Sequence, residues 1–373
     1  MKIRIDQKEL ADAARHAFRR LPTNPLNPVL AGLLIEAPEG GPVALSGFDL
    51  ETATRATLDA DVLEAGNTLA SGRLLADVTA ALPAGPVDVV ADERELTLTA
   101  PGTAFTLPTM DRHDYPALPT PPGAAGVIDG GVFAAAVVHA AQAAMPEKEA
   151  IGNMEGFSGV HVAADGDSLI VSATDRYRIV RHTVPWTPDG DGGGELLLPA
   201  AGFAVTAKQM AGSTVRIAFT SPSGGVAALA TDTLTVTSRT IGAAFPDISS
   251  YFPDPAKSVG WARLDAAELL EAVKRAALVN EKEEQPIALD FGRDQVTVRG
   301  GVEGSKGASR VDAETADLED FSINYRPGFL GSLLAPIDGL AQMWFTVPSK
   351  PALIAPVDDD TYRAVCMPVR LPK

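Results

Sequence analysis

Two hydrophobic periods alternate three times along this chain. Apolar residues recurring every three to four positions predict amphipathic helices that begin after Asp6, Asp129 and Asp265. Each aspartate suits a helix N-cap, because its carboxylate accepts hydrogen bonds from the free N–H groups of a first turn. After each helix the period falls to about two, which is typical of strands that bury one face. The chain is therefore predicted to be α+β and to repeat one unit three times.

The strand signals place one hairpin in each third of the chain. The predicted hairpins pair 33–37 with 42–48, 159–163 with 168–174, and 287–291 with 295–299. A second helix follows each hairpin, over 71–82, 199–210 and 326–334. Segments rich in Pro or Gly at 116–126 and 251–258 separate the thirds. Repeats of this length are too long for a solenoid, so we expect tandem domains at 1–123, 124–254 and 255–373.

Composition limits the class of protein and at first argues against nucleic acid. The 373 residues include 48 acidic and 31 basic side chains, a formal charge of −17, and such a chain as a whole repels DNA. Its single cysteine, Cys366, excludes an intrachain disulfide. Because neither a signal peptide nor a long apolar run is visible, we expect a cytoplasmic protein without membrane spans.

A search for catalytic chemistry finds no convincing constellation. The five histidines are scattered without metal-ligand spacing, and no nucleophile elbow is visible. The segment 301–309 resembles a phosphate loop only faintly, and we expect it to be a flexible turn. Three successive aspartates at 358–360 favour a solvated turn over a magnesium site. We therefore expect no enzymatic activity, no metal and no cofactor.

The charges on two predicted helices revise the argument about nucleic acid. In the first helix, apolar residues share one face and basic residues the other, the basic ones being Lys8, Arg15 and Arg19. In the helix after Asp265 the exposed face carries Lys274, Arg275 and Lys282. The alternative is an ordinary solvated surface stabilised by i,i+4 ion pairs. The absence of Lys and Arg between Asp129 and Pro146 weakens the argument for a basic helix face in the middle repeat.

Five sequence segments carry a resemblance to a known family. The sequence TDRYRI at 174–179, the FPD at 245–247 followed by Pro253, and the ending MPVRL at 367–371 are similar to three motifs of one protein. PVLAGLL at 28–34 and RAALVNEK at 275–282 are further matches. On these segments, in this order and separation, the chain resembles the bacterial sliding clamp, the beta subunit of DNA polymerase III, of the actinobacterial type.

The resemblance implies a fold and a function. Members of the family are homodimers in which three repeats from each subunit, joined head to tail, form a six-domain ring with helices lining the hole. Such a ring encircles double-stranded DNA and tethers polymerase, clamp loader and repair proteins without catalysing a reaction. An acidic outer surface and a basic lining are compatible in a ring, because topology holds the DNA without base readout.

Site residues follow from the resemblance, position by position. A pocket between the second and third repeats is implied to bind short peptides with an apolar end, using Phe157, Thr174, Arg176, Tyr177, Arg178, Ile179, Pro246, Ser250, Tyr251, Pro351, Val365, Met367, Pro368, Val369 and Arg370. Residues implied to face DNA are Lys8, Arg15, Arg19, Arg20, Lys274, Arg275 and Lys282. Residues implied at the dimer interface are Phe105, Leu107 and Leu278.

The chain also departs from the family. After Phe245-Pro246 the family usually has an aromatic residue and an arginine, whereas this chain has Asp247 and then a run ending in Tyr251-Phe252. We expect two bulky aromatics to reshape the pocket wall. Two alternatives stay open: a second clamp copy whose altered pocket tolerates a pocket-binding inhibitor, and an interaction scaffold outside replication. Asn24, where the family usually has a DNA-contacting arginine, motivates the scaffold.

Overall fold

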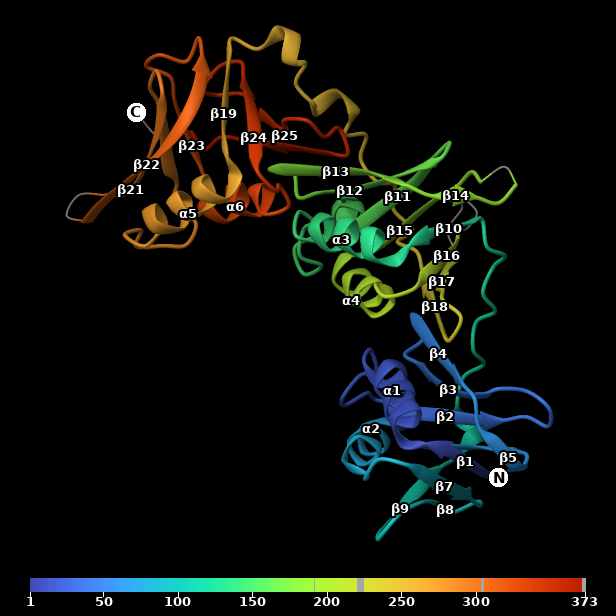
Figure 1. The fold of residues 1–373 in the computed structure, drawn as a ribbon. Helices are drawn as coiled ribbons and strands as arrows, with labels where there is room; N and C mark the ends of the chain where they lie inside the picture. Colours follow the sequence, from blue (N-terminus) through green and yellow to red (C-terminus); the bar gives the residue numbers. More distant parts are fainter. Residues whose placement is uncertain (191, 220–224, 303–304, 371–373) are drawn as a thin grey trace. The chain divides into compact units, whose positions relative to one another are not determined.

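The protein is described by a computed structural model covering residues 1–190, 192–219, 225–302 and 305–370. These residues form two compact units (Figure 1). Unit 1 comprises Met1–Gly131, Pro188–Gly194 and Lys208–Thr240, and unit 2 comprises Val132–Thr187, Glu195–Ala207 and Ile241–Lys373. Each unit is built on one large sheet.

The α-helices lie where the hydrophobic pattern predicts them, two in each third of the chain. Asp6 and Asp265 cap α1 and α5, and their side chains accept hydrogen bonds from the backbone N–H groups of Lys8 and Glu268. The helices are α1 Gln7–Phe18, α2 Gly72–Ala81, α3 Gly130–Ala141, α4 Ala200–Met210, α5 Ala266–Ala277 and α6 Pro327–Leu334. Short 3-10 helices are η1 Pro28–Ala31, η2 Arg112–Asp114, η3 Gly152–Ser158, η4 Ser249–Tyr251 and η5 Pro255–Lys257.

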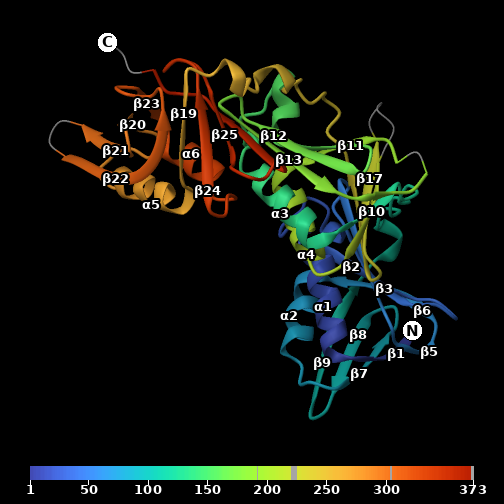
Figure 2. The ribbon, with the colours of Figure 1, turned by 45° about the horizontal axis from the view of Figure 1, so that its top comes forward.

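Unit 1 is built on a sheet in the order β14-β10-β16-β17-β18-β4-β3-β2-β6-β9-β8-β7-β1-β5. The helices α1 and α2 pack on each other, and α1 also packs on β3 and β4 (Figure 2). This packing buries the apolar face of α1, including Leu10, Ala14 and Ala17. The strands are β1 Lys2–Asp6, β2 Gly32–Ala37, β3 Val43–Phe48, β4 Thr52–Leu58, β5 Asp61–Glu64, β6 Gly66–Ser71, β7 Pro86–Ala91, β8 Glu95–Ala100, β9 Thr103–Met110, β10 Gly126–Asp129, β14 Thr187–Pro188, β16 Thr214–Ala218, β17 Val226–Ala230 and β18 Leu234–Arg239.

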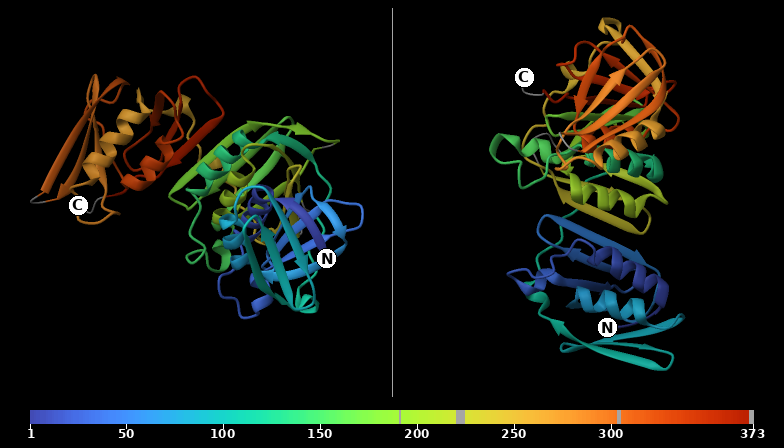
Figure 3. Two further views of the ribbon diagram at one scale, coloured as in Figure 1. Left: turned by 60° about the horizontal axis from the view of Figure 1, so that its bottom comes forward. Right: turned by 90° about the vertical axis from the view of Figure 1, so that its left-hand side faces the viewer.

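Unit 2 is built on a sheet in the order β15-β11-β12-β13-β26-β25-β24-β19-β22-β21-β20-β23. The rings of Phe133 in α3 and Phe203 in α4 meet edge to face, with their centroids 5.8 Å apart. The helices α5 and α6 lie side by side (Figure 3). The strands are β11 Gly159–Asp165, β12 Ser168–Thr174, β13 Arg178–Pro185, β15 Glu195–Pro199, β19 Gly260–Asp265, β20 Ile287–Phe291, β21 Gln295–Val302, β22 Ser305–Ala316, β23 Ser322–Tyr325, β24 Leu340–Phe345, β25 Ala352–Pro356 and β26 Tyr362–Cys366.

Both sheets run across the junctions between the sequence repeats. In unit 1, β4 of the first repeat pairs antiparallel with β18 of the second, with Ala56 opposite Leu234. In unit 2, β13 of the second repeat pairs antiparallel with β26 of the third, with Ile179 opposite Val365. The two units therefore divide the second repeat, and the domain boundaries at 123/124 and 254/255 stay a prediction from the sequence. The three predicted hairpins are present as β2–β3, β11–β12 and β20–β21.

The expected flexible turn at 301–309 is wrong for the described part of that segment. Gly301 and Val302 are the last residues of the hairpin strand β21, and Ser305–Ser309 belong to the partner strand β22. At Gly300 a β-carbon would lie 1.9 Å from the carbonyl oxygen of Ala276, so only glycine lets β21 approach the end of α5 this closely. Gly300 therefore serves helix–strand packing.

Membrane insertion through a helix has no support in the described residues, where every helix is too short or too polar to cross a bilayer.

Candidate functional site

The turn between β12 and β13 is held by side chains of its own motif. The Asp175 carboxylate accepts hydrogen bonds from the N–H groups of Tyr177 and Arg178, each at 3.0 Å. The Thr174 hydroxyl accepts from the N–H of Arg176 at 3.1 Å and donates to the carbonyl of Arg178 at 2.8 Å. Arg176 has a φ of 79°, a conformation that costs a residue with a β-carbon roughly 1–2 kcal/mol. The turn thus holds Tyr177 exposed beside a strained arginine.

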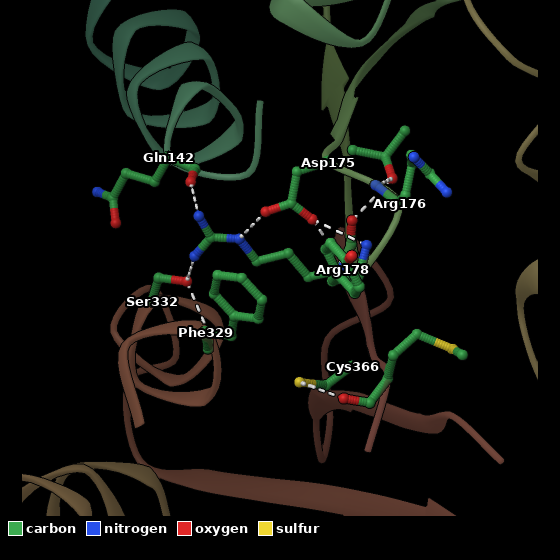
Figure 4. A network of polar contacts seen from close by, with 10 residues as sticks. Gln142, Asp175, Arg176, Arg178, Phe329, Ser332 and Cys366 are labelled. Carbon is green, nitrogen blue, oxygen red and sulfur yellow. Dashed lines mark hydrogen bonds and ion pairs between the residues drawn. The ribbon is translucent and has the colours of Figure 1, made fainter. Parts of the chain in front are cut away.

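Arg178 connects this turn to two helices of unit 2. Its Nε donates to Oδ2 of Asp175 at 3.0 Å, one Nη donates to the Ser332 hydroxyl at 2.5 Å, and the other donates to the Gln142 carbonyl (Figure 4). The guanidinium carbon also lies 4.6 Å from the centroid of the Phe329 ring. Because both charged side chains are nearly buried, Arg178 is a structural link between the turn, α6 and the segment after α3.

A small apolar cluster lies beneath the turn. Ile179 of β13, Val365 of β26 and Leu353 of β25 are buried together on adjacent strands. Ile248 and Phe252 pack against this cluster from the segment before β19. The continuous pairing of β13, β26 and β25 therefore supplies an apolar floor.

A cavity of about 450 Å³ opens above this floor, within unit 2. It is lined by Arg176, Tyr177, Arg178, Ile179, Ser250, Tyr251, Pro253, Thr346, Ser349, Lys350, Pro351, Val365, Met367 and Arg370. Half of these residues are apolar or aromatic, and the charged residues among them are all cations. Such a cavity suits a ligand with an apolar end and polar or anionic groups near it.

The structure brings together most of the pocket residues implied by the sequence. Those that line the cavity are Arg176, Tyr177, Arg178, Ile179, Ser250, Tyr251, Pro351, Val365, Met367 and Arg370. Pro253, Thr346, Ser349 and Lys350 line it as well and were missed. Pro253 closes a motif that the sequence did single out. The loop 346–350 carries no motif, and only the β24–β25 pairing brings it to the cavity.

Five implied pocket residues do not line the cavity: Phe157, Thr174, Pro246, Pro368 and Val369. Thr174 is buried, and its hydroxyl is used inside the turn. The Val369 N–H donates to the carbonyl of Asn324, which ties this part of the tail to β23. Pro246 follows Phe245, whose ring stacks on His161 at 4.8 Å, away from the cavity lining. Leu371 of the C-terminal motif lies outside the described residues.

The departure from the family motif changes the pocket less than expected. Of the two bulky aromatics, Phe252 packs inward on the apolar cluster, and only Tyr251 lines the cavity. The Asp247 carboxylate accepts hydrogen bonds from the backbone N–H and the hydroxyl of Ser249, which hold its pKa below the ordinary value. The expectation that both aromatics form the wall is therefore wrong, because one of them is needed as core.

Cys366 offers no nucleophile in this region. Its side chain is fully buried under the pocket, and burial raises the pKa of its thiol to about 12. A thiol with that pKa is protonated at neutral pH, so Cys366 is not a nucleophile there.

The predicted DNA-facing cations are exposed or half-buried, and several have partners on their own helix. Lys8 and Arg15 both pair with Asp12, at 3.1 and 2.7 Å, and Lys274 pairs with Glu271 at 2.7 Å. Partial burial tends to raise the pKa of Asp12. Lys8 and Arg15 outweigh this tendency and hold that pKa below its ordinary value. These pairs are what the solvated-surface alternative predicts. Asp12 alone does not balance Lys8 and Arg15, but with Glu9 the two acidic and two basic side chains of α1 cancel. The remaining cations of this set are Arg19, Arg20, Arg275 and Lys282.

The implied dimer-interface residues separate into two exposed side chains and one buried side chain. Phe105 in β9 is 39% exposed, and Leu278 at the end of α5 is 82% exposed. Leu107 is buried opposite Leu96 of β8, so it offers little exposed surface, and its place in an interface stays a prediction.

Family profiles match this chain in three successive segments. The profile described as DNA polymerase III beta subunit, N-terminal domain, matches residues 1–119. The profile of the central domain matches residues 131–247, and that of the C-terminal domain matches residues 251–370.

Whole-chain relatives agree with these profiles. The beta sliding clamp of Streptomyces coelicolor is 37% identical over the full length of both chains. The beta sliding clamp homolog GriR of Streptomyces muensis is 32% identical over 99% of each chain. A crystal structure of a sliding clamp from Pseudomonas aeruginosa bound to griselimycin has a TM-score of 0.90 over all of both chains, with 21% identity. At 21% identity, this structural similarity shows that the two chains share a fold.

Proposed function

This chain belongs to the DNA polymerase III beta subunit family, the bacterial sliding clamps, and we propose that it acts as a processivity factor in replication. It would encircle double-stranded DNA without sequence preference and tether the replicative polymerase, the clamp loader and repair proteins. The proposal includes a cytoplasmic location and no catalytic activity or cofactor of its own.

The pocket in unit 2 is the observation that supports this function most. It combines four segments of the sequence: the turn at 176–179, the segment 250–253, the loop 346–351 and the end at 365–370. An apolar floor with polar positions at its edge suits a short extended peptide, which gains affinity by burying large apolar side chains. Binding of several partners through one peptide class explains how a protein without a catalytic site serves several enzymes.

Two strand edges support assembly into a head-to-tail dimer. Within the described residues, 103–108 of β9 pair with β8 alone, and 305–312 of β22 pair with β21 alone. Unpaired edges are templates for a strand from another chain. The exposed Phe105 lies on the first edge, and Leu278 ends α5, which packs on β22. We propose that two copies join these edges and close a six-domain ring.

Leu278→Arg is expected to convert the dimer to a monomer and to abolish retention on DNA. The substitution places a charge in an apolar contact that is fully buried in the proposed interface, where an unpaired charge is strongly unfavourable. Sedimentation velocity measures the dimer. Retention is measured after a bacterial clamp loader has placed the protein on nicked circular DNA, and cutting that DNA should release the wild-type ring.

Leu63→Arg is the matched control, because Leu63 is also a large exposed apolar residue, on β5. It should leave both dimerisation and retention unchanged. A Leu278→Arg protein that still sediments as a dimer would show that the interface lies elsewhere. A wild-type dimer that is never retained on circular DNA, and never lengthens polymerase products, would favour the interaction scaffold.

The second candidate function is that of a clamp copy with a modified pocket, and Tyr251 is the observation that favours it. Tyr251 is 59% exposed and lines the cavity at a position where the family motif differs. A peptide and a compact inhibitor contact such a wall differently. Selection for inhibitor tolerance would therefore lower the affinity for the inhibitor more than the affinity for the peptide.

For this second candidate, we expect griselimycin to lose about tenfold in affinity relative to a partner peptide, about the loss of one good apolar contact. The comparison uses this protein, a clamp carrying the usual motif, and the variant Tyr251→Ala, with both ligands measured by calorimetry. If the ratio of the two affinities is the same for both clamps, the second candidate is wrong and the processivity function is unaffected.

A further inference from the structure

We propose that the contact between Phe245 and His161, which lies outside the cavity lining, holds one wall of the pocket in place and thereby sets its affinity for ligands. That wall is formed by Ser250, Tyr251 and Pro253. The inference rests on the proposed peptide-binding function and identifies positioning residues for it, which act on the ligand through the wall.

The segment that carries this wall crosses the sheet of unit 2 strand by strand. We call residues 241–253 the strap. At its start, the N–H of Ile241 donates to the carbonyl of Leu197 in the edge strand β15 at 2.8 Å. Phe245 then lies on His161 of β11, the next strand of the sheet. The far end of the strap packs on the apolar cluster of β13, β26 and β25. The strap therefore connects one edge of the sheet to the pocket floor.

The anchor at Phe245 is a flat stack on a histidine whose orientation is fixed. The centroids of the Phe245 and His161 rings are 4.8 Å apart, and the ring planes are 9° from parallel. Nε2 of His161 lies 2.9 Å from Oε2 of Glu195 in β15, and the His161 side chain is 17% exposed. A ring that is packed and hydrogen-bonded at its edge presents its face in one direction. Glu195 therefore orients the surface on which Phe245 lies.

Two glycines let the strap approach the sheet at this anchor. A β-carbon at Gly156 would lie 2.2 Å from the carbonyl oxygen of Ala244, and one at Gly159 would lie 2.8 Å from Cδ1 of Ile241. Neither glycine has a positive φ, so close approach of the strap is the reason for glycine at both positions. The chain before β11 is thus fitted to the strap immediately before Phe245.

Between its two anchored ends, the described contacts of the strap are mainly internal. The Asp247 carboxylate is exposed and accepts hydrogen bonds from Ser249. The N–H of Tyr251 donates to the carbonyl of Ile248 at 3.1 Å. These contacts shape η4 but do not fix it to the sheet. The position of η4, and with it the pocket wall, therefore depends on the anchors on either side.

Loss of the Phe245 anchor should lower the fraction of molecules in which the wall is in place. The apparent affinity of a ligand falls in proportion to the fraction of protein that is competent to bind it. A packed aromatic pair changes such an equilibrium by a factor on the order of ten or less. We therefore expect His161→Ala to weaken ligand binding about fivefold.

The test measures the affinity of the full chain for a fluorescent peptide that ends in two large apolar residues, by fluorescence anisotropy. His161→Ala should bind it about fivefold more weakly than the wild type. Phe245→Leu, which changes the strap and leaves the sheet intact, should weaken binding as well. His161→Phe should restore most of the affinity, because it keeps a flat ring beneath Phe245.

Phe321→Ala is the matched control. It removes another partly buried aromatic ring of unit 2, whose centroid lies 6.1 Å from that of Phe291 and 5.2 Å from that of Phe345. Neither contact involves the strap. The control should therefore lower the free energy of unfolding while leaving peptide affinity unchanged.

A double-mutant cycle shows whether His161 acts through the wall. In a Tyr251→Ala protein, which lacks the largest side chain of the wall, His161→Ala should weaken binding by less than about twofold. Hydrogen exchange gives a second readout that needs no ligand. The amide of Tyr251 should exchange faster in His161→Ala than in the wild type, and Phe321→Ala should leave its exchange unchanged.

The outcomes separate this inference from the function on which it rests. Equal peptide affinity of His161→Ala and the wild type would overturn the inference and leave the peptide-binding function intact. An equal loss in Phe321→Ala, or effects of His161→Ala and Tyr251→Ala that simply add, would also overturn it, because the cause would then be general stability. Failure of the wild type to bind the peptide would overturn the peptide-binding function and the role of the anchor together.

Discussion

Arg178→Ala is expected to lower the free energy of unfolding of unit 2 by about 3–5 kcal/mol, the range for breaking a buried ion pair from one side. The substitution removes a cation that Asp175 pairs with at 3.0 Å and leaves that carboxylate nearly buried. It also removes the hydrogen bonds to Ser332 and Gln142, which join the turn to α6 and to the segment after α3. Because the turn carries Tyr177 into the cavity, peptide binding should be lost as well.

Urea unfolding followed by tryptophan fluorescence measures this effect in unit 2 alone. All three tryptophans, Trp186, Trp261 and Trp344, belong to that unit. Arg293→Ala is the matched control, since Arg293 makes an exposed ion pair with Glu319 at 3.0 Å and should contribute less than about 1 kcal/mol. If Arg178→Ala lowers the free energy of unfolding by no more than Arg293→Ala does, the proposed structural link is wrong.

Unit 2 is expected to lose about 3 kcal/mol of stability between pH 6.5 and pH 4 because of His182 alone. Burial and, to a smaller extent, the neighbouring His139 lower the pKa of His182 to about 4, against the opposing effect of the Asp359 charge. The unfolded chain binds the proton near pH 6.5 and the folded chain only near pH 4. Protonation therefore favours unfolding across this window, and the stability is present above it and lost as the pH falls.

The packing around His182 explains why its charged form is disfavoured. Its ring lies 4.7 Å from the Tyr362 ring and 5.6 Å from the His139 ring, and among the described residues its Nε2 has no hydrogen-bond partner. His182→Phe should abolish most of the stability change in this window, read from tryptophan fluorescence. His113→Gln, which alters an exposed histidine of unit 1, should not. An unchanged pH profile in His182→Phe would assign the effect to other groups.

The repeats were predictable because their signals are local. A helix cap such as Asp265 acts on the N–H groups of the next turn, and a hairpin such as 287–291 with 295–299 needs only alternating residues and a short turn. Hence the helices and the three hairpins lie where the pattern predicts. The segment 301–309 was predicted wrongly, because its described residues continue the pairing of β21 with β22, in which Gly301 lies opposite Lys306.

Pocket residues were predictable only where a single motif supplies both the side chains that hold a turn and the exposed residues that the turn presents. At 174–179 the side chains of Thr174 and Asp175 close the turn that presents Arg176 and Tyr177. Lys350 has no such local partner, so no pattern in its neighbourhood marks it as a pocket residue. At Leu107 the motif could not show how much of the side chain is exposed, because its burial opposite Leu96 depends on the register of β9.

The sequence by itself determined the α+β repeat, the capped helices, the hairpins and the family, because each depends on short stretches of chain. The tertiary structure alone decided which side chains share a space. Antiparallel pairing of β13 with β26 sets Ile179 opposite Val365 and forms the pocket floor, and packing sends Phe252 inward while Tyr251 faces the cavity. It also decided which charges are available, since Arg178 is occupied by partners distant in sequence whereas Lys350 is not. Net charge describes the whole surface, but binding depends on the few charges that folding leaves unpaired at one place.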